Sequence, residues 1–298
     1  MQWKGRRGSG NIEDRRRAGG TGTGGTGRTG TGRASAGIGG AGAVVVILLA
    51  LFLGVDPRSL LDGGGIDLGG SGTGGSTAEL SAEERAAGEF VSVTLADTEE
   101  VWAALFRAQL NRTYAPATLV LFREATTSPC GGASEATGPF YCPADRKVYL
   151  DTAFFAVMRD RLGAGGDFAA AYVVAHEVGH HIQNELGILA EANRIRARVS
   201  EAESNEISVR IELQADCLSG IWAREAARRL GTIEAGDIEE AMNAAAAIGD
   251  DTLQRNAGRR PMPDSFTHGT SEQRMRWFAR GHDSGRIADC DTFEAARL

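Results

Sequence analysis

Net positive charge is lacking beyond the first 33 residues of this chain. Residues 1–33 carry eight Lys or Arg residues against Glu13 and Asp14, a net charge of +6. The whole chain carries −7, so the remainder carries −13. Proteins that bind nucleic acid present a basic patch or stripe. The acidic remainder therefore argues against nucleic acid as a partner.

Long apolar stretches are also scarce, with one exception. The run 34–55 contains no charged residue, and as a helix it is long enough to cross a bilayer with a hydrocarbon core of about 30 Å. Because the basic flank precedes this run and positive charge tends to stay cytoplasmic, we expect a single-pass anchor in the cell membrane with an extracytoplasmic C-terminal domain. The strongly apolar part, Val44 to Val55, is short, so a cleaved signal peptide and a buried core helix are the alternatives.

Large apolar side chains are few in the glycine-rich stretches on either side of this run. Glycine and threonine dominate Thr21 to Gly32, and glycine runs recur between 63 and 75. Such segments bury too little apolar surface to offset the entropy of ordering them. We therefore expect a basic disordered cytoplasmic arm over 1–33, a Gly-rich linker over 56–80, and a folded domain over 81–298.

Cysteine is rare, and the small even number of four fits disulfides in an oxidising compartment. Cys130 and Cys142 bracket a loop with glycine and proline, whereas Cys217 and Cys290 are far apart in the sequence. Four cysteines permit three pairings. We favour 130 with 142 and 217 with 290. Four free thiols in a reducing compartment are the alternative.

Proline is scarce as well, and none occurs between 189 and 230, where Ala, Glu, Arg, Leu and Ile predominate. This composition predicts one long helix or two in series. Further helices are predicted for Asp97–Leu110 with Asp97 and Glu100 as a capping box, for Asp167–Gly187, for about 234–248, and for Thr270–Arg280 with Gly281 as the end. Thr118–Phe122 and Lys147–Asp151 are rich in β-branched or aromatic residues and are predicted strands. The fold class is therefore α+β, mostly helical with a small β-sheet.

Histidine is also rare, yet three of the five residues fall within six positions, at His176, His180 and His181. The apolar stretch before them predicts a buried helix. On such a helix His176 and His180 lie on one face and offer two imidazole nitrogens to one ion, while Glu177 lies about 100° round the axis. Zinc fits this arrangement because it keeps a position open for water, from which Glu177 can take a proton. The alternative is a helix whose two histidines are hydrogen-bonded in the core, without metal.

His181 points about 100° away from His180, so we do not expect it to share the ion. A hydrogen bond or packing at the pocket edge is the expected role of His181.

Two histidines do not complete a zinc shell. The next helix supplies Glu212 and Asp216, another i, i+4 pair on one face. Because buried carboxylates without a cation are costly, we expect Glu212 as the third ligand and Asp216 as the outer acceptor that holds a ligand imidazole in its tautomer. Two alternatives stay open: Asp216 is itself the ligand, or both carboxylates pair with Arg210 and Arg224 at a surface.

These residues resemble a known family. The segments that carry the resemblance are His176-Glu-Val-Gly-His-His-Ile-Gln183, Glu212-Leu-Gln-Ala-Asp-Cys217 and Phe266-Thr-His-Gly-Thr-Ser-Glu-Gln-Arg274. They look like the bacterial putative neutral zinc metallopeptidase family over roughly 80–298 and, more distantly, like gluzincin proteases. The resemblance implies a zincin-like fold with Zn²⁺ as cofactor. It maps the third zinc ligand of the gluzincins, the glutamate of an ExxxD segment, onto Glu212, and the aspartate of that segment onto Asp216. It also places His268 near the substrate, with Gly269 where the gluzincins have proline.

We therefore predict a zinc-dependent endopeptidase in which Glu177 is the general base and His268 assists at the developing oxyanion. The peptide substrate is expected beside a strand, Thr118–Phe122. The alternatives are a catalytically inactive, zinc-stabilised binding or scaffold ectodomain and a structural ectodomain without metal. Neither the identity of the substrate nor the oligomeric state follows from the sequence.

Overall fold

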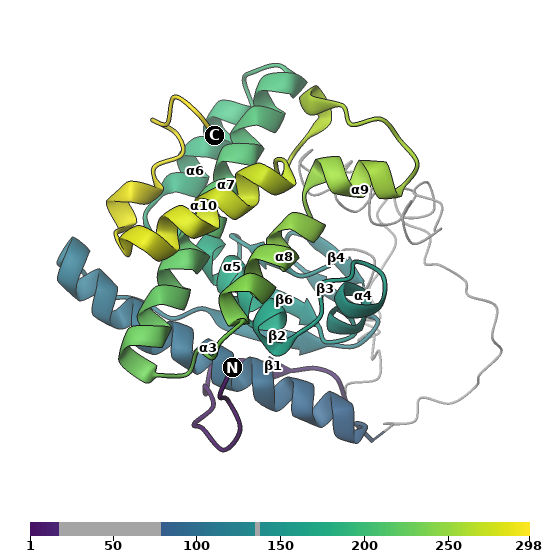
Figure 1. Cartoon of the computed structure of the whole chain (residues 1–298), viewed down its shortest axis with the longest axis vertical. Coiled ribbons are helices and arrows are strands. Elements are labelled where there is room, and N and C mark those ends of the chain that lie inside the picture. The colour runs from purple at the N-terminus through teal and green to yellow at the C-terminus, as the bar shows by residue number, and fades with distance from the viewer. Residues whose placement is uncertain (18–78, 135–137) are drawn as a thin grey trace, which may run out of the picture.

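The computed structural model describes residues 1–17, 79–134 and 138–298, which form a mostly helical α+β domain with a small sheet (Figure 1). The helices are α3 (Ala82–Leu105), α4 (Phe154–Asp160), α5 (Asp167–Glu185), α6 (Ile188–Arg196), α7 (Glu201–Leu230), α8 (Asp237–Ala247), α9 (Asp250–Asn256) and α10 (Ser271–Ser284). The strands are β1 (Ile12–Asp14), β2 (Thr118–Phe122), β3 (Ala125–Ser128), β4 (Gly131–Ser134), β5 (Phe140–Cys142) and β6 (Lys147–Asp151). The predicted fold class is confirmed, as are the two helices in series between 189 and 230.

The main sheet has the order β1-β2-β6-β5. Strands β1, β2 and β6 are parallel, and β5 runs antiparallel to β6, while β3 and β4 form a separate hairpin. The sequence predicted β2 and β6 because they are rich in β-branched or aromatic residues, and it missed the other strands because they are short or polar. Since β2 is hydrogen-bonded on both sides, the expected place of the peptide beside Thr118–Phe122 is wrong. Strand β5 has an open edge within the described residues.

Helix α3 begins earlier than its sequence pattern indicated. Ser81 caps the helix, because its side chain accepts the backbone N–H of Glu84 and the Glu84 side chain accepts that of Ser81. Asp97, the expected cap, lies inside α3 as a buried residue and pairs with Arg6. An acidic residue thus fits the middle of this helix because a distant arginine neutralises it.

Helix α10 has the predicted cap at Thr270 and Gln273, but its predicted end at Gly281 is wrong. The helix continues to Ser284, and Gly285 ends it with a φ of +65°. A Cβ atom at Gly281 would clash with the backbone carbonyl of Cys217 in α7. Glycine is therefore required at 281 for the close approach of α7 and α10.

Both predicted disulfides are confirmed. Cys130 is bonded to Cys142, and Cys217 is bonded to Cys290. The first joins the β3–β4 hairpin to β5, and the second joins α7 to the segment that follows α10.

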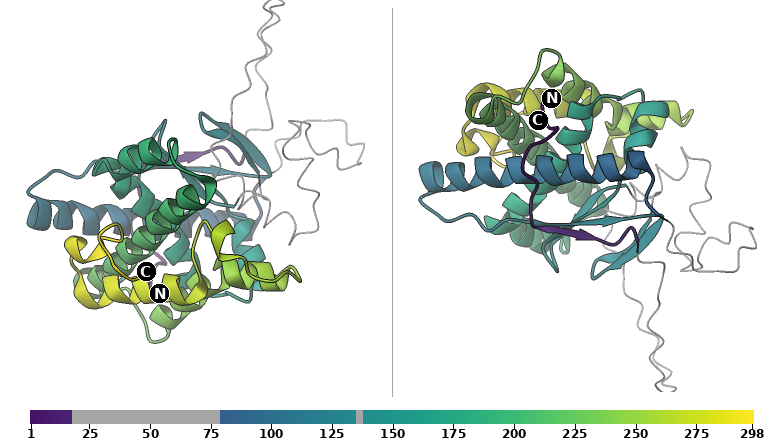
Figure 2. Two further views of the ribbon diagram at one scale, coloured as in Figure 1. Left: turned by 90° about the horizontal axis from the view of Figure 1, so that it is seen from above. Right: turned by 90° about the horizontal axis from the view of Figure 1, so that it is seen from below.

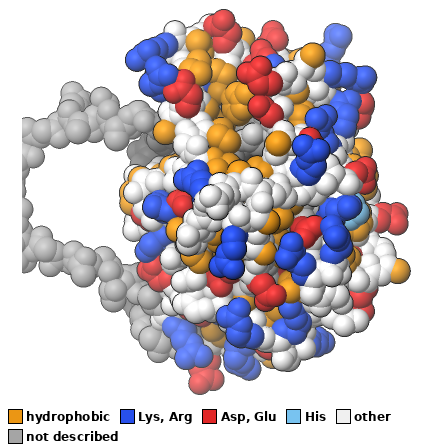
Figure 3. Space-filling view, turned by 90° about the vertical axis from the view of Figure 1, so that its left-hand side faces the viewer, with side chains coloured by type: hydrophobic (Ala, Val, Ile, Leu, Met, Phe, Trp, Pro, Cys, Tyr) orange, Lys and Arg blue, Asp and Glu red, His pale blue; other side chains and the backbone are white. Residues whose placement is uncertain are grey.

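The N-terminal arm packs on the body over residues 1–17, so the expectation of a disordered arm is wrong there. The amino group of Met1 lies 2.8 Å from an oxygen of Asp167 and 3.2 Å from one of Asp237. From there the arm crosses α3 and adds β1 to the sheet (Figure 2). Arg6 pairs with Asp97 of the body, whereas Arg15 and Arg16 pair with Glu13 and Asp14 of the arm itself. The arm is therefore held by strand pairing and by the contacts of Met1 and Arg6 with the body. In the face shown in Figure 3, Lys and Arg likewise lie among Asp and Glu.

The pairing of β1 with β2 holds residues 12–14 against the body. The expected anchor at 34–55 and the rest of 18–78 lie outside the described residues. Within the residues that are described, no helix is both long and apolar enough to span a bilayer.

Helix α5 occupies a central position in the domain. It packs against the helices α3, α7 and α8 and against the strands β5 and β6 of the sheet. Trp102, Trp222 and Trp277 are buried in the core around it. A helix held from so many directions is a rigid carrier for functional side chains.

Candidate metal centre

Close packing of α5 against α7 brings two i, i+4 pairs together: the histidines of α5 and the carboxylates of α7. Gly179 lies between the two histidines of α5, and a Cβ atom there would be only 3.1 Å from the backbone of Ala215. Ala215 in turn lies between Glu212 and Asp216 on α7. The small residues therefore let the two helix backbones approach where the functional side chains project.

Three predicted ligands converge at this contact. Nε2 of His176 lies 3.1 Å from Oε2 of Glu212, and Nε2 of His180 lies 3.5 Å from Oε1 of the same carboxylate. One ligand atom from each residue lies within 4.8 Å of the other two. Two imidazole nitrogens and a carboxylate oxygen are a donor set that zinc accepts with a fourth position open.

The other nitrogen of each imidazole is held by a side chain. Nδ1 of His176 lies 2.9 Å from Asp216, and Nδ1 of His180 lies 2.8 Å from Oε1 of Gln183. An imidazole that donates through Nδ1 presents the Nε2 lone pair to an ion. Asp216 therefore lies in the predicted outer position, and the alternative that makes it the ligand has no support in this geometry. Gln183 was missed, although it ends the first quoted motif.

Asp216 is fully buried and is surrounded by donors. Arg274 donates to both carboxylate oxygens at 2.9 Å, and the hydroxyl of Tyr172 donates to Oδ1 at 2.5 Å. The sequence analysis missed both residues. Their signals were weak: Tyr172 precedes His176 by one helical turn, and Arg274 ends the third quoted motif.

The alternative in which the carboxylates pair with Arg210 and Arg224 at a surface is wrong. Arg210 contacts Glu206 and backbone carbonyls near the C-terminus. Arg224 donates to the carbonyl of His282. The cation that neutralises Asp216 comes instead from α10.

The charges of the site shift its protonation equilibria. Burial by itself would lower the pKa of His176, but Asp216 and Glu212 outweigh that effect and raise it to about 9. Burial opposes ionisation of Glu212, yet the nearby imidazoles, His180 first, hold the pKa of that carboxyl well below its usual range. A metal ion that binds here must displace a proton from His176, as is general for imidazole ligands.

Glu177 is buried beside these ligands, and burial raises the pKa of its carboxyl. Its Oε2 atom is buried and has no hydrogen-bond partner among the residues that the structure describes. A buried polar atom without a partner is costly, so this oxygen calls for a ligand such as water. The residues present therefore fit a zinc ion with a water molecule that Glu177 can polarise.

His268 lies in the turn before α10 and close to the cluster. Its charge is one of the causes that lower the pKa of Glu212. Gly269, where the gluzincins have proline, has a φ of +87°, which proline cannot adopt. Glycine in place of proline at 269 therefore gives the turn before α10 a backbone conformation that proline would not allow.

His181 has the kind of role that was expected for it. Its Nδ1 lies 3.1 Å from the hydroxyl of Tyr141 in β5, and its Nε2 lies 2.7 Å from the carbonyl of Ala115. Both nitrogens are occupied by these contacts. His181 therefore links the metal-site helix to the open-edged strand.

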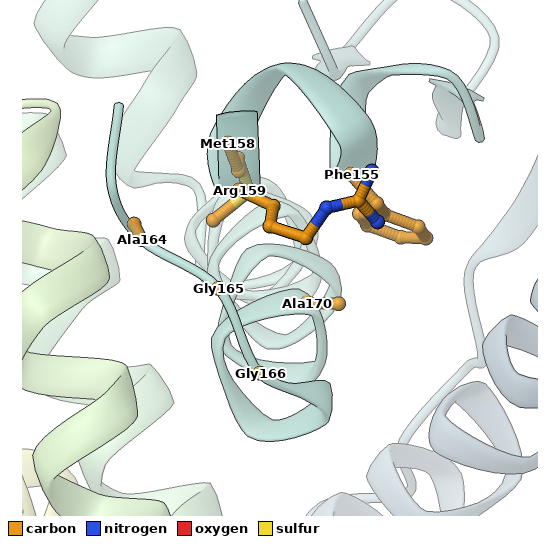
Figure 4. Close-up of a pocket in the computed structure, with 7 residues that line it drawn as sticks. All are labelled: Phe155, Met158, Arg159, Ala164, Gly165, Gly166 and Ala170. Atoms are coloured by element: carbon orange, nitrogen blue, oxygen red, sulfur yellow. The ribbon is translucent and has the colours of Figure 1, made fainter. Parts of the chain in front are cut away.

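A cavity of about 200 Å³ lies elsewhere, between α4 and the start of α5 (Figure 4). Phe155 and Met158 line it, and the side chain of Arg159 extends across it. None of the candidate ligands or catalytic residues contributes to its lining. The candidate ligands at the α5–α7 contact therefore lie away from this cavity.

Comparison with known proteins agrees with the geometry. The family model described as "Putative neutral zinc metallopeptidase" matches residues 1–293, so the match includes the docked arm and not only the region from 80 onward. Uncharacterized protein YpfJ of Escherichia coli (strain K12) is 47% identical over 293 residues, which cover 98% of this chain and 99% of that protein.

A more distant relative is Uncharacterized protein Rv2575 of Mycobacterium tuberculosis (strain ATCC 25618 / H37Rv), 38% identical over 259 residues that cover 84% of this chain and 86% of that protein. No solved structure gives a significant match. The whole-chain family match implies zinc as the cofactor. The chain belongs to the family described as "Putative neutral zinc metallopeptidase".

Proposed function

We propose that this protein is a zinc-dependent endopeptidase that hydrolyses peptide bonds with a water molecule activated by Glu177. The observation that carries the proposal is the convergence of His176, His180 and Glu212 beside a buried, partnerless oxygen of Glu177. Metal ligands alone would serve a structural site equally well. The buried Oε2 atom of Glu177, which lacks a hydrogen-bond partner in the described part of the chain, favours hydrolysis.

Each residue has a distinct part in this chemistry. Zinc held by His176, His180 and Glu212 would polarise the scissile carbonyl and make bound water acidic near neutral pH. Glu177 accepts the proton of the attacking water and then passes it to the leaving amine. His268 is the proposed donor to the developing oxyanion.

The proposed place for the peptide is the open edge of β5. Strand β5 packs against α5, and its Tyr141 contacts His181, the neighbour of a candidate ligand. An extended peptide can add to an open strand edge through main-chain hydrogen bonds. This placement replaces the one beside β2.

Metal removal is the direct test. We expect the purified chain to contain one zinc ion, to cleave denatured protein substrates, and to lose both properties with a strong chelator. Because zinc binds the folded state, restoring zinc at about a thousandfold excess over its Kd should raise the free energy of unfolding by about 4 kcal/mol. Mass spectrometry of the metal, a peptide-library cleavage assay and denaturant unfolding measure the three effects.

The outcomes separate the alternatives. One zinc ion per chain with no cleavage of any substrate would favour the inactive scaffold. A chain whose metal content and melting temperature ignore the chelator would favour the structural ectodomain without metal. Either result contradicts the endopeptidase proposal.

Membrane anchoring through 34–55 stays a separate proposal, with a condition attached. An anchor that crosses the membrane once would separate residues 1–17 from the body, and β1 could then not pair with β2 of the same chain.

A Cβ atom built at Gly8 lies 3.3 Å from Cβ of Ser92, close to the Cβ separation of disulfides, about 3.5–4.5 Å. If the arm docks in the cell, the variant with Gly8→Cys and Ser92→Cys should become cross-linked.

The cross-link is measured in intact oxidised cells by non-reducing tryptic mapping with mass spectrometry. Gly10→Cys with Ser92→Cys is the matched control, since a Cβ atom at Gly10 meets no atom within 4 Å. Cross-linking of the first pair alone would exclude an anchor that separates arm and body. Failure of both pairs would favour the single-pass arrangement with the body extracytoplasmic.

A further inference from the structure

One buried carboxylate shapes the turn that carries His268. Asp250, at the start of α9, is completely buried. Its Oδ2 accepts the backbone N–H groups of Thr267 at 2.7 Å, of His268 at 2.6 Å and of Gly269 at 3.1 Å. Its own N–H donates to the carbonyl of Gly269 at 2.9 Å. Three successive amides thus converge on a single oxygen, which fixes the backbone of the turn.

The second oxygen of Asp250 holds the imidazole itself. Oδ1 lies 3.2 Å from Nδ1 of His268, and the hydroxyl of Thr267 lies 3.1 Å from the same nitrogen. Nε2 of His268 makes no hydrogen bond to another residue in the described parts of the chain. Because the two nitrogens lie on opposite sides of the ring, holding Nδ1 at Asp250 directs Nε2 away from it.

The turn also has a fixed place relative to the ligands. A Cβ atom at Gly269 would lie 3.2 Å from Val209 and 3.3 Å from Leu213, so the turn packs on the α7 segment that contains Glu212. The charges of His268 and Glu212 are close enough to shift each other's pKa. The turn therefore places an oriented imidazole on the side of α7 that carries Glu212. Asp250 makes this turn rigid, as a proline at 269 would otherwise do.

We propose that Asp250 is a positioning residue for the reaction, which orients His268 so that Nε2 can reach the substrate carbonyl. This inference rests on the proposed endopeptidase function and adds to it a residue that never touches the substrate. The carboxylate acts at two points, since one oxygen sets the backbone of the turn and the other sets the ring. The pattern is that of a histidine whose tautomer and orientation are fixed by a neighbouring acid.

The test compares Asp250→Asn with a matched control in the full chain. Asparagine keeps the shape but replaces one acceptor oxygen by an NH₂ group. The one oxygen that remains cannot accept hydrogen bonds from both the turn amides and the ring N–H. We expect kcat to fall about 10- to 100-fold, the size found when a group that holds a metal-ligating histidine is removed, with KM and zinc content nearly unchanged. Asp251→Asn is the control, because Asp251 contacts Ser271 and Arg255 instead of His268, and its kcat should stay near the wild-type value.

A double variant distinguishes positioning from general loss of structure. If Asp250 acts through His268, Asp250→Asn should cause no further fall in kcat when His268→Gln is already present. A fall of the same size in that background would overturn the proposal, because Asp250 would then act by another route. An equal fall in Asp251→Asn would overturn it as well.

A readout without turnover keeps this inference separate from the proposed function. With five histidines in the chain, the ring ¹⁵N signals of the metal-free protein can be assigned with His268→Gln. We expect the wild-type His268 ring to show protonated Nδ1 and the Asp250→Asn ring to lose this preference. Identical His268 signals in both proteins would overturn the positioning role. Absence of hydrolysis in the wild type would contradict the proposed function alone.

Discussion

Glu177→Gln should leave zinc bound and abolish most of the hydrolysis. The amide cannot accept a proton from water, and loss of a general base typically reduces a rate by about 10²- to 10⁴-fold. Glu177 is not among the three convergent ligand residues, so zinc content should equal that of the wild type. Turnover of a cleavable peptide and metal analysis on the same preparation measure the two effects.

The stability of this variant adds a second expectation. Burial disfavours the charged form of Glu177 and raises its pKa, so a neutral side chain of the same shape should not lower the melting temperature. Glu185→Gln is a suitable control, because Glu185 lies at the end of the same helix and pairs with Arg146. Unchanged turnover in Glu177→Gln would contradict the proposed mechanism, and loss of zinc would show that Glu177 is a ligand.

Arg274→Met should cost more stability than any exposed charge substitution on the same helix. Asp216 and Arg274 are both buried, and the guanidinium donates to both carboxylate oxygens. Removing one partner leaves a buried charge without compensation, which typically costs about 3–5 kcal/mol. Asp216 also holds Nδ1 of His176, so we expect weaker zinc binding in addition. Denaturant unfolding of the metal-free protein and a zinc titration measure the two effects.

Arg276→Met supplies the control for this prediction. Arg276 lies on α10 as well, but its partner Glu272 is largely exposed, and such surface pairs contribute about 0–1 kcal/mol. Adding Asp216→Asn to Arg274→Met removes the uncompensated charge and should recover part of the stability. Equal losses in the free energy of unfolding for Arg274→Met and Arg276→Met would show that the buried pair of Asp216 and Arg274 stabilises the fold no more than a surface pair.

Local rules were sufficient for the ligand-bearing segments. The i, i+4 spacing of His176 with His180, and of Glu212 with Asp216, follows from 3.6 residues per helical turn. The apolar sequences of β2 and β6 likewise identified these strands. In each case the signal and the structure it produces lie within one segment.

Errors arose where a local pattern had a distant cause. Asp97 with Glu100 has the spacing of a capping box, but Arg6 from the arm accommodates Asp97 within a helix. Gly281 is the residue type that often ends a helix, but glycine is needed there because a Cβ atom would clash with the backbone of Cys217. The basic arm has the composition of a disordered segment, but the pairing of β1 with β2 and the contacts of Met1 and Arg6 with the body hold residues 1–17. No window of neighbouring residues contains these partners.

By itself the sequence determined α5 to α8, the start of α10, the two buried strands, and the candidate residues for zinc binding and water activation, because helical periodicity and side-chain chemistry are local properties. Only the tertiary structure decided which charges neutralise one another. Arg274 reaches Asp216 from α10, and Asp250 reaches His268 from α9. These pairs form because folding excludes water from the site, and a buried charge is then stable only where another element brings its partner within hydrogen-bond distance.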